Sequence, residues 1–298
     1  MAQSHILVGT DTELSAPTVR HITTSDVWNS LAKGWDDFSA MPSHAIFLCV
    51  IYPIIGVGIA AFTLGQAVLP LLFPLAAGFA LLGPFAAMGL YELSRRREAG
   101  VGVSASDAFK VVHSPSIGAI VALGLLLMLV FLTWVATANA IYVAHFGYAA
   151  PQSVSQFAHD VFMTPEGRSM ILIGNGVGFL FALLVLAISV VSFPLLIDRD
   201  AGAAGALLTS VRAVLANPVP MALWGLIVAV LLALGSLPLF LGLPLVLPVL
   251  GHATWHLYRK VVEPDPNPRP DYQPRPKGGR HAADFPAVLF PWARDDMH

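Results

Sequence analysis

Four long stretches without a single Asp, Glu, Lys or Arg divide this chain. They run from residue 40 to 91, from 111 to 159, from 169 to 197 and from 213 to 258. A bilayer core of about 30 Å needs about 20 apolar residues in one helix. The first and last stretches are therefore long enough for two spans joined by a tight turn, and each of the others holds one.

This pattern predicts an all-α membrane protein with six transmembrane helices. Lipid cannot satisfy open backbone groups, so each span must be a helix. Turn residues divide the two longer stretches, Gly65-Gln66 in the first and Gly242-Leu243-Pro244 in the last. The predicted spans are residues 43–63, 67–90, 117–145, 170–196, 219–236 and 243–258.

Composition agrees with the membrane assignment, and the basic residues orient it. Hydrophobic residues make up 56% of the chain and charged residues only 11%, where soluble domains average about 25% charged. With six spans, fifteen of the sixteen Lys and Arg residues fall on one side and Arg168 falls on the other. Because cytoplasmic loops carry the excess of Lys and Arg, the sequence predicts an inner-membrane protein with both termini in the cytoplasm.

A similar amphipathic segment precedes the first, third and fifth spans, and each ends at a proline. In the first, Trp28, Leu31, Trp35 and Phe38 recur at helical spacing, with Asp26 as the expected N-cap. Proline disfavours helix at the residue before it, so each segment should stop at Pro42, Pro115 or Pro218. The chain is thus expected to be three hairpins, each entered through an interfacial helix on the cytoplasmic side.

The expected domain organisation has three parts. Residues 1–42 form a cytoplasmic N-terminal segment with its interfacial helix, and residues 43–262 form the transmembrane domain. Residues 263–298 are rich in proline and cannot bury a core, so an extended or disordered tail is expected. Within it, the apolar run from Phe285 to Trp292 is a candidate contact for a membrane-protein partner or for the tail's own protein or lipid.

His252 and His256 are four residues apart and share one face of the sixth predicted span. Metal and haem sites often use this spacing. Trp255, Tyr258 and Arg259 surround the pair, as expected for an aromatic belt with its positive flank. Two histidines without further ligands favour a hydrogen-bonded structural role, so no metal and no cofactor is predicted.

Other polar residues at the span ends complete the candidate list. Asp198, Arg199 and Asp200 stand where the fourth span meets the cytoplasm, as an anchor for helix depth or as a gate. Asn175 lies in a Gly-rich run of that span and is available for an interhelical hydrogen bond. The run Arg95, Arg96 and Arg97 is a candidate site for anionic lipid head groups.

Several motifs resemble one bacterial family of predicted integral membrane proteins whose function is unknown. They are Gly34-Trp35-Asp36-Asp37-Phe38, the stretch from Phe193 to Asp200, Thr209-Ser210-Val211-Arg212-Ala213-Val214 with Asn217-Pro218, and the closing run from Gly251 to Arg259. Some members carry the label of cytochrome c oxidase subunit I. Six spans and two embedded histidines are too few for a haem–copper catalytic subunit, so the label implies an accessory role beside a respiratory complex.

The predicted spans contain no Asp, Glu, Lys or Arg near the bilayer midplane. Ion-coupled pumps usually need ionisable residues inside the membrane. No hydrolase elbow, phosphate loop or zinc helix points to an enzyme, and no basic domain points to nucleic acid. The sequence therefore favours a non-catalytic membrane protein, an accessory or assembly partner of a larger complex. The alternative is a facilitator or channel for a small neutral or lipidic solute.

Overall fold

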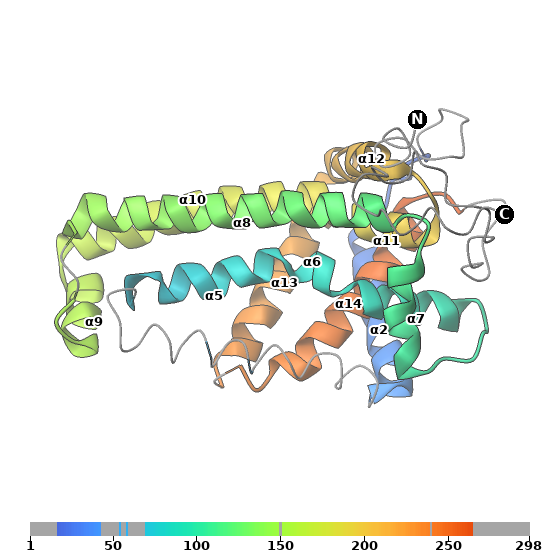
Figure 1. Ribbon diagram of the computed structural model, residues 1–298, viewed down its shortest axis with the longest axis horizontal. Helices are drawn as coiled ribbons and strands as arrows, with labels where there is room; N and C mark the ends of the chain where they lie inside the picture. The colour runs from blue at the N-terminus through green and yellow to red at the C-terminus, as the bar shows by residue number, and fades with distance from the viewer. Residues whose placement is uncertain are drawn as a thin grey trace, which may run out of the picture.

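The computed structural model describes residues 17–42, 54, 58, 69–148, 151–238 and 240–264, and the described segments are built from helices (Figure 1). Apart from residues 54, 58, 263 and 264, the predicted first span and the Pro-rich tail, including the run from Phe285 to Trp292, lie outside the described residues. The elements, in chain order, are α2 (Thr24–Ala40), the 3₁₀ helix η1 (Leu69–Leu71), α5 (Leu72–Leu81), α6 (Gly83–Ala86), α7 (Met88–Glu98), the 3₁₀ helix η2 (Ala105–His113), α8 (Ile117–Phe146), α9 (Val154–Met163), α10 (Pro165–Ser189), α11 (Ser192–Asp198), α12 (Gly202–Ala216), α13 (Pro218–Ser236) and α14 (Leu243–Val261).

Three helical segments among the described residues are long and apolar enough to cross a bilayer: Ile117–Phe146, Pro165–Asp198 and Pro218–Ser236. They coincide with the predicted third, fourth and fifth spans, and this confirms an all-helical membrane fold. At a rise of 1.5 Å per residue, the 30 residues of α8 extend about 45 Å. Its ends therefore project beyond a hydrocarbon core of about 30 Å.

The predicted second span is broken into short helices. Where the sequence predicted one helix over residues 67–90, the structure has η1, α5, α6 and the start of α7. Pro70 lies in η1, Pro74 in α5 and Pro84 in α6. Each proline removes a backbone donor and disfavours helix before it, and three within fifteen residues divide the segment. α7 then continues to Glu98, past the predicted exit.

The fourth predicted span also has a break, between α10 and α11. Val190 is the C-cap of α10. Pro194 in α11 has no N–H to donate to the Val190 carbonyl. Ser192 Oγ donates to the carbonyls of Ile188 at 2.6 Å and of Ala206 at 3.1 Å. The kink is thereby joined to α12, which packs against it.

α2 begins one turn earlier than the sequence suggested. The predicted N-cap was Asp26, but the N-cap is Thr23, and Asp26 is the third residue of the helix. The Asp26 carboxylate accepts from the Thr23 backbone N–H at 3.0 Å, and the Thr23 side chain accepts from the Asp26 N–H in return. This reciprocal capping box stabilises the first turn. Ser104 and Asp107 repeat it at the start of η2.

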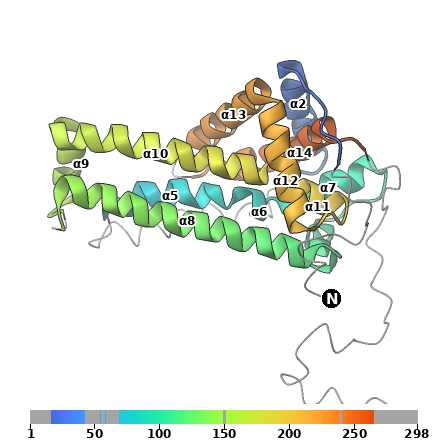
Figure 2. The ribbon, with the colours of Figure 1, turned by 90° about the horizontal axis from the view of Figure 1, so that it is seen from above.

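A helix that the sequence analysis did not predict, α9, lies at the end of α8 and α10 farthest from α7, α11 and α12 (Figure 2). Gly147 ends α8 with a φ of 73°, and Ser153 caps α9 through its side chain. A Cβ at Gly167 would lie 2.2 Å from the carbonyl oxygen of Asp160. Only glycine therefore permits the close turn from α9 into α10.

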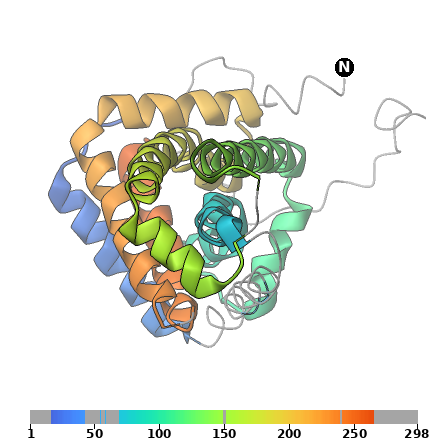
Figure 3. The same ribbon diagram turned by 90° about the vertical axis from the view of Figure 1, so that its left-hand side faces the viewer.

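Trp134 on α8 joins the long helices to α5. Seen end-on in Figure 3, α5 lies in the middle, beside α8 and α10. The Trp134 indole N–H donates to the carbonyl of Pro74 at 2.8 Å, and its ring lies 5.5 Å from that of Phe181. A Cβ at Gly78 would meet the same indole at 2.7 Å. This contact explains a glycine inside α5.

Both described ends of the chain meet at the end of the bundle formed by α7, α11, α12 and the last turns of α14, called here the polar end. Val19 and Val262 form an isolated antiparallel bridge. The Asn217 side chain accepts from the Ile22 N–H at 2.8 Å and donates to the Arg20 carbonyl at 3.1 Å. The segment before α2 is thereby fixed to the α12–α13 junction and to the end of α14.

Candidate functional site

At the polar end α2 and α14 pack with almost no space between their backbones, and α7 packs against α14 through the Leu90 side chain. A Cβ at Gly34 would lie 2.6 Å from Ala253, and one at Gly251 would lie 2.5 Å from Leu90. The buried residues of α2 are Val27, Ser30, Gly34, Asp37 and Phe38, so small and polar side chains face α14 along most of the helix. Close approach brings short polar side chains from all three helices into direct contact.

Asp37 is the centre of this contact, and we name its group the Asp37 cluster: Asp37, Ser94, Arg97, His252 and His256. The Asp37 Oδ2 atom accepts from His256 Nε2 at 2.8 Å and from the Ser94 hydroxyl at 2.5 Å. Its Oδ1 atom accepts from the Arg97 guanidinium. A carboxylate with only 4% exposure is therefore compensated from two helices.

The hydrogen bonds fix the form of the His252 ring. Ser94 has one hydroxyl proton, and it is donated to Asp37. The contact of 2.7 Å between Ser94 Oγ and His252 Nδ1 must then carry the ring's proton. In the neutral ring Nε2 is left as an acceptor. It is buried and has no hydrogen-bond partner among the described residues.

The environment of Asp37 keeps its carboxyl ionised. Burial alone would raise its pKa, but hydrogen bonds from His256 and Ser94, together with the charge of His256, outweigh that effect. The pKa is lowered from 3.8 to about 2. Asp37 is therefore an anion at neutral pH and holds α7 and α14 against α2.

The presence of Ser, His and Asp in one cluster does not make a nucleophile. In a hydrolase triad the serine gives its proton to histidine, and the carboxylate orients that histidine. Here the Ser94 hydroxyl is bonded to the carboxylate, and both Ser94 and His252 are fully buried. The arrangement joins helices and offers no path for a substrate to the serine.

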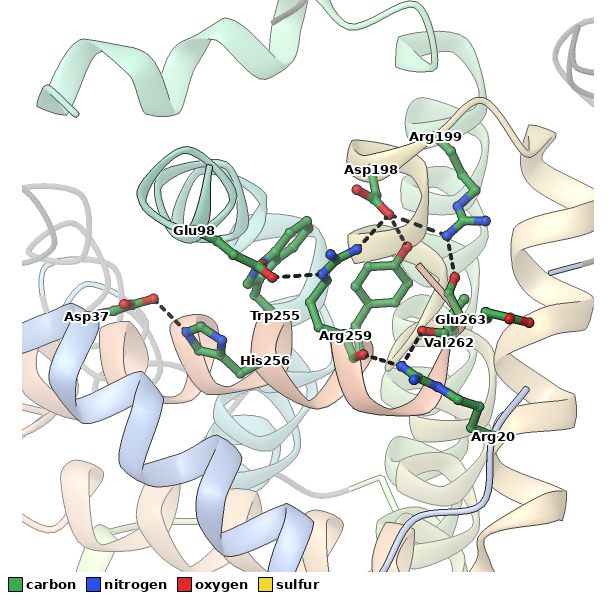
Figure 4. A network of polar contacts seen from close by, with 11 residues as sticks. Arg20, Asp37, Glu98, Asp198, Arg199, Trp255, His256, Arg259, Val262 and Glu263 are labelled. Atoms are coloured by element: carbon green, nitrogen blue, oxygen red, sulfur yellow. Dashed lines mark hydrogen bonds and ion pairs between the residues drawn. The ribbon is translucent and has the colours of Figure 1, made fainter. Parts of the chain in front are cut away.

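A second group, the Asp198 cluster, joins α11 to α14 and α7 (Figure 4). Asp198 Oδ2 accepts from the Tyr258 hydroxyl at 2.6 Å and lies 3.5 Å from an Arg259 nitrogen. Glu98 accepts from Arg259 at 3.1 Å and from the Trp255 indole at 2.8 Å. These contacts fix the end of α14 against the helices beside it.

Arg199 contacts the backbone just after the end of α14. Its Nη2 atom donates to the Glu263 carbonyl at 2.7 Å and lies 3.6 Å from Asp198 Oδ2. Arg20 donates to the carbonyls of Arg259 and Val262 at 2.8 and 3.0 Å. The two arginines thereby hold the backbone at the point where α14 ends.

The three consecutive arginines of α7 face different partners. Arg95 and Arg96 both bind Glu92, at 2.8 and 2.7 Å, and their side chains are 8% and 3% exposed. The side chain of Arg97 is 40% exposed and reaches Asp37. Binding of lipid head groups by this run stays a prediction, and Arg97 is the member with the most open surface.

Two further predicted residues are Asn175 and Asp200. Asn175 is exposed on α10, and its amide donates to the carbonyl of Ile171 in its own helix at 2.7 Å. Asp200 is buried just after α11. Within the segments that the structure describes, no three His, Cys, Asp or Glu side chains gather as a metal would require.

Asp37 and Ser94, the residues that connect the two predicted histidines, were not singled out from the sequence. A signal was present, because Val27, Ser30, Gly34 and Asp37 recur at helical spacing along one face of α2. The tryptophans of the same helix lie on a different, exposed face. Ser94 had no comparable signal, since serines are frequent at helix ends.

Apolar helices of spanning length, joined at one end by buried ion pairs, define a helical integral membrane protein. Residues 71–198, from α5 to the end of α11, match the model of the family described as "Predicted integral membrane protein (DUF2189)". This match confirms the resemblance to a membrane family of unknown function, and the description names no activity. Searches of curated proteins and of solved structures each returned no match.

Proposed function

We propose that this chain is a non-catalytic protein of the bacterial inner membrane that serves as an accessory or assembly partner of a larger membrane complex. The proposal rests on the polar contacts that join neighbouring helices at the polar end. The predicted residues His252, His256, Asp198 and Arg199 do not converge on one cavity. They bind neighbouring helices in separate clusters, as parts of a scaffold do.

Six crossings with both ends in the cytoplasm are part of the same proposal. Among the described Lys and Arg residues, Arg168 is in the first turn of α10, next to α9. The others lie on α2, α7, η2, α12 and α14, or directly beside α2 and α11. The residues that enter α2 and leave α14 are bonded to each other. Neighbouring ends require an even number of crossings. The three spanning segments, α5 to α7 and α14 would supply five, and the proposed sixth is the predicted first span, most of which lies outside the described residues.

The second candidate function is a facilitator or channel for a small neutral or lipidic solute. Two grooves have volumes of about 490 and 330 Å³, and both are lined almost entirely by apolar side chains on the flanks of helices. The first lies between α2, α13 and α14, and the second between α6 and α8. Apolar linings favour contact with lipid or protein over passage of a polar solute.

The test is purification of the tagged full chain from native membranes in a mild detergent, with co-purifying proteins identified by mass spectrometry. We expect a stoichiometric membrane-protein partner. Phe290→Ala with Trp292→Ala in the tail should reduce its recovery, because the tail leaves the fold at the polar end. Tyr148→Ala, an exposed aromatic at the other end, is the matched control. Recovery of the chain as a single component would overturn the proposal.

A further inference from the structure

The larger groove lies beneath α2, and its position is set by how that helix crosses the bundle. α2 begins beside Asn217 and ends at Met41, which packs against Leu93 and Ala108. Both of its ends therefore contact elements of the polar end, and α2 lies across that end beside α13 and α14 (Figures 1 and 3). One side of α2 is closed against α14, and another faces the groove.

The groove is built from three helices and is almost wholly apolar. Its walls include Trp28, Ala32 and Trp35 of α2, Leu231 of α13, and Leu245 and Val249 of α14. Trp28 and Trp35 remain 54% and 52% exposed. Ligand sites commonly enclose about 300–1,000 Å³, and the 490 Å³ here accommodates one long hydrocarbon chain.

The groove runs from the polar end into the depth of the helices. Leu231 is thirteen residues from the start of α13, so it lies about 20 Å along that helix. Tryptophans are enriched where a bilayer meets water. Trp28 and Trp35 flank the side of the groove that lies at the polar end, called here its shallow side. A lipid acyl chain is the ligand that would meet tryptophan at one end and leucine at the other.

Two opposite charges stand beside the shallow side. Lys33 and Asp36 are exposed, three residues apart on α2, and Asp36 itself lines the groove. Residues three apart are neighbours on a helix surface. A zwitterionic head group complements this pair, with its phosphate near the ammonium of Lys33 and its amine near the carboxylate of Asp36. An anionic head group would meet Asp36 as a like charge.

We propose that the groove between α2, α13 and α14 binds one acyl chain of an amine-bearing zwitterionic phospholipid, with Lys33 and Asp36 beside the head group. The inference rests on the membrane assignment and not on a partner complex. A chain that purifies without partners would leave it intact.

The experiment is native mass spectrometry of the delipidated full chain, titrated with phosphatidylethanolamine, phosphatidylglycerol or a free fatty acid. We expect one phosphatidylethanolamine per chain, retained about tenfold more tightly than the other two. Ala32→Phe and, from the opposite wall, Val246→Phe should each abolish this retention. Ala204→Phe, on the exposed face of α12, should leave it unchanged. Asp36→Ala should remove the preference for the amine head group.

Quenching of Trp28 and Trp35 by phosphatidylethanolamine with brominated chains gives a second readout, which Ala32→Phe should reduce. Equal retention in wild type, Ala32→Phe and Val246→Phe would overturn the proposal. So would a preference for phosphatidylglycerol. A dimer that Ala32→Phe dissociates would assign the groove to a second copy of the chain and would overturn it as well.

Discussion

The Asp37 Oδ2 atom lies 2.8 Å from the Nε2 atom of His256, although 219 positions separate the two residues in the chain. Asp37 comes from the helix before the first predicted span, and His256 comes from the last helix. The contact closes the bundle at the polar end. It also places a carboxylate where the sequence showed only a pair of histidines.

Asp37→Asn should destabilise the folded protein by about 3 kcal/mol, because removing one partner of a buried ion pair leaves the other uncompensated. Arg97 and His256 both lose their acceptor charge in this variant. Thermal unfolding in detergent without added lipid measures the effect. Asp36→Asn changes the neighbouring exposed carboxylate and should shift stability by less than about 0.5 kcal/mol. Equal stability of the two variants would show that the Asp37 contacts contribute little.

Stability should fall in acid over a window set by Asp37. Its folded pKa of about 2 lies below the ordinary value of 3.8. The ionised carboxylate thus favours the folded state above pH 4, and this contribution is lost as pH falls from about 4 to about 2. Allowing for solvent screening, it amounts to about 1 to 2 kcal/mol.

The measurement is the free energy of unfolding from pH 6 down to pH 2, for wild type and for Asp37→Asn. The difference between them should shrink across the acid window, because only wild type loses the contribution of the ionised Asp37 carboxylate there. Asp107, whose pKa is also lowered to about 2, titrates in both proteins and cancels from the difference. A constant difference at all pH values would contradict the assignment to Asp37.

Gly34→Ala should separate α2 from α14. The added Cβ would lie 2.6 Å from the Cβ and N atoms of Ala253 and 2.7 Å from the carbonyl oxygen of Val249. Backbone atoms cannot give way cheaply, so the expected loss is about 1–3 kcal/mol. Gly176→Ala on α10 is the control, because no atom lies within 4 Å of its added Cβ. Alanine also forms helix better there, by about 1 kcal/mol.

Unfolding monitored by tryptophan fluorescence would compare these two glycine variants. The expected order of stability is Gly176→Ala first, wild type next and Gly34→Ala last. If Gly34→Ala has the same stability as wild type, α2 and α14 do not pack as closely as described.

The proposed topology predicts which loops face the cytoplasm. In a Cys49→Ser background, Gln152→Cys before α9 should react with a membrane-impermeant maleimide in spheroplasts. Gly102→Cys at the polar end should react only after lysis. Both positions are exposed in the protein, so their difference reports the side of the membrane. Labelling of Gly102→Cys in sealed spheroplasts would reverse or break the proposed topology.

The sequence by itself determined the membrane class and the positions of α8, α13 and most of α10. Those segments are apolar without interruption, and only a helix satisfies its backbone groups in lipid. Local chemistry placed the start of α2 to within one turn, but the N-cap is Thr23 and not the predicted Asp26. Where Pro70, Pro74 and Pro84 crowd one segment, local sequence showed a possible kink but not how many helices would result.

Only the tertiary structure decided what the polar residues do. The spacing of His252 and His256 on one helix is the same whether they bind a metal or bind protein. Their partners, Ser94 and Asp37, come from helices far away in the sequence. A hydrogen bond between two side chains depends on where whole helices cross. Gly34 lets α2 approach the backbone of α14, and Gly251 leaves room on α14 for the Leu90 side chain of α7, so that polar groups from the three helices meet.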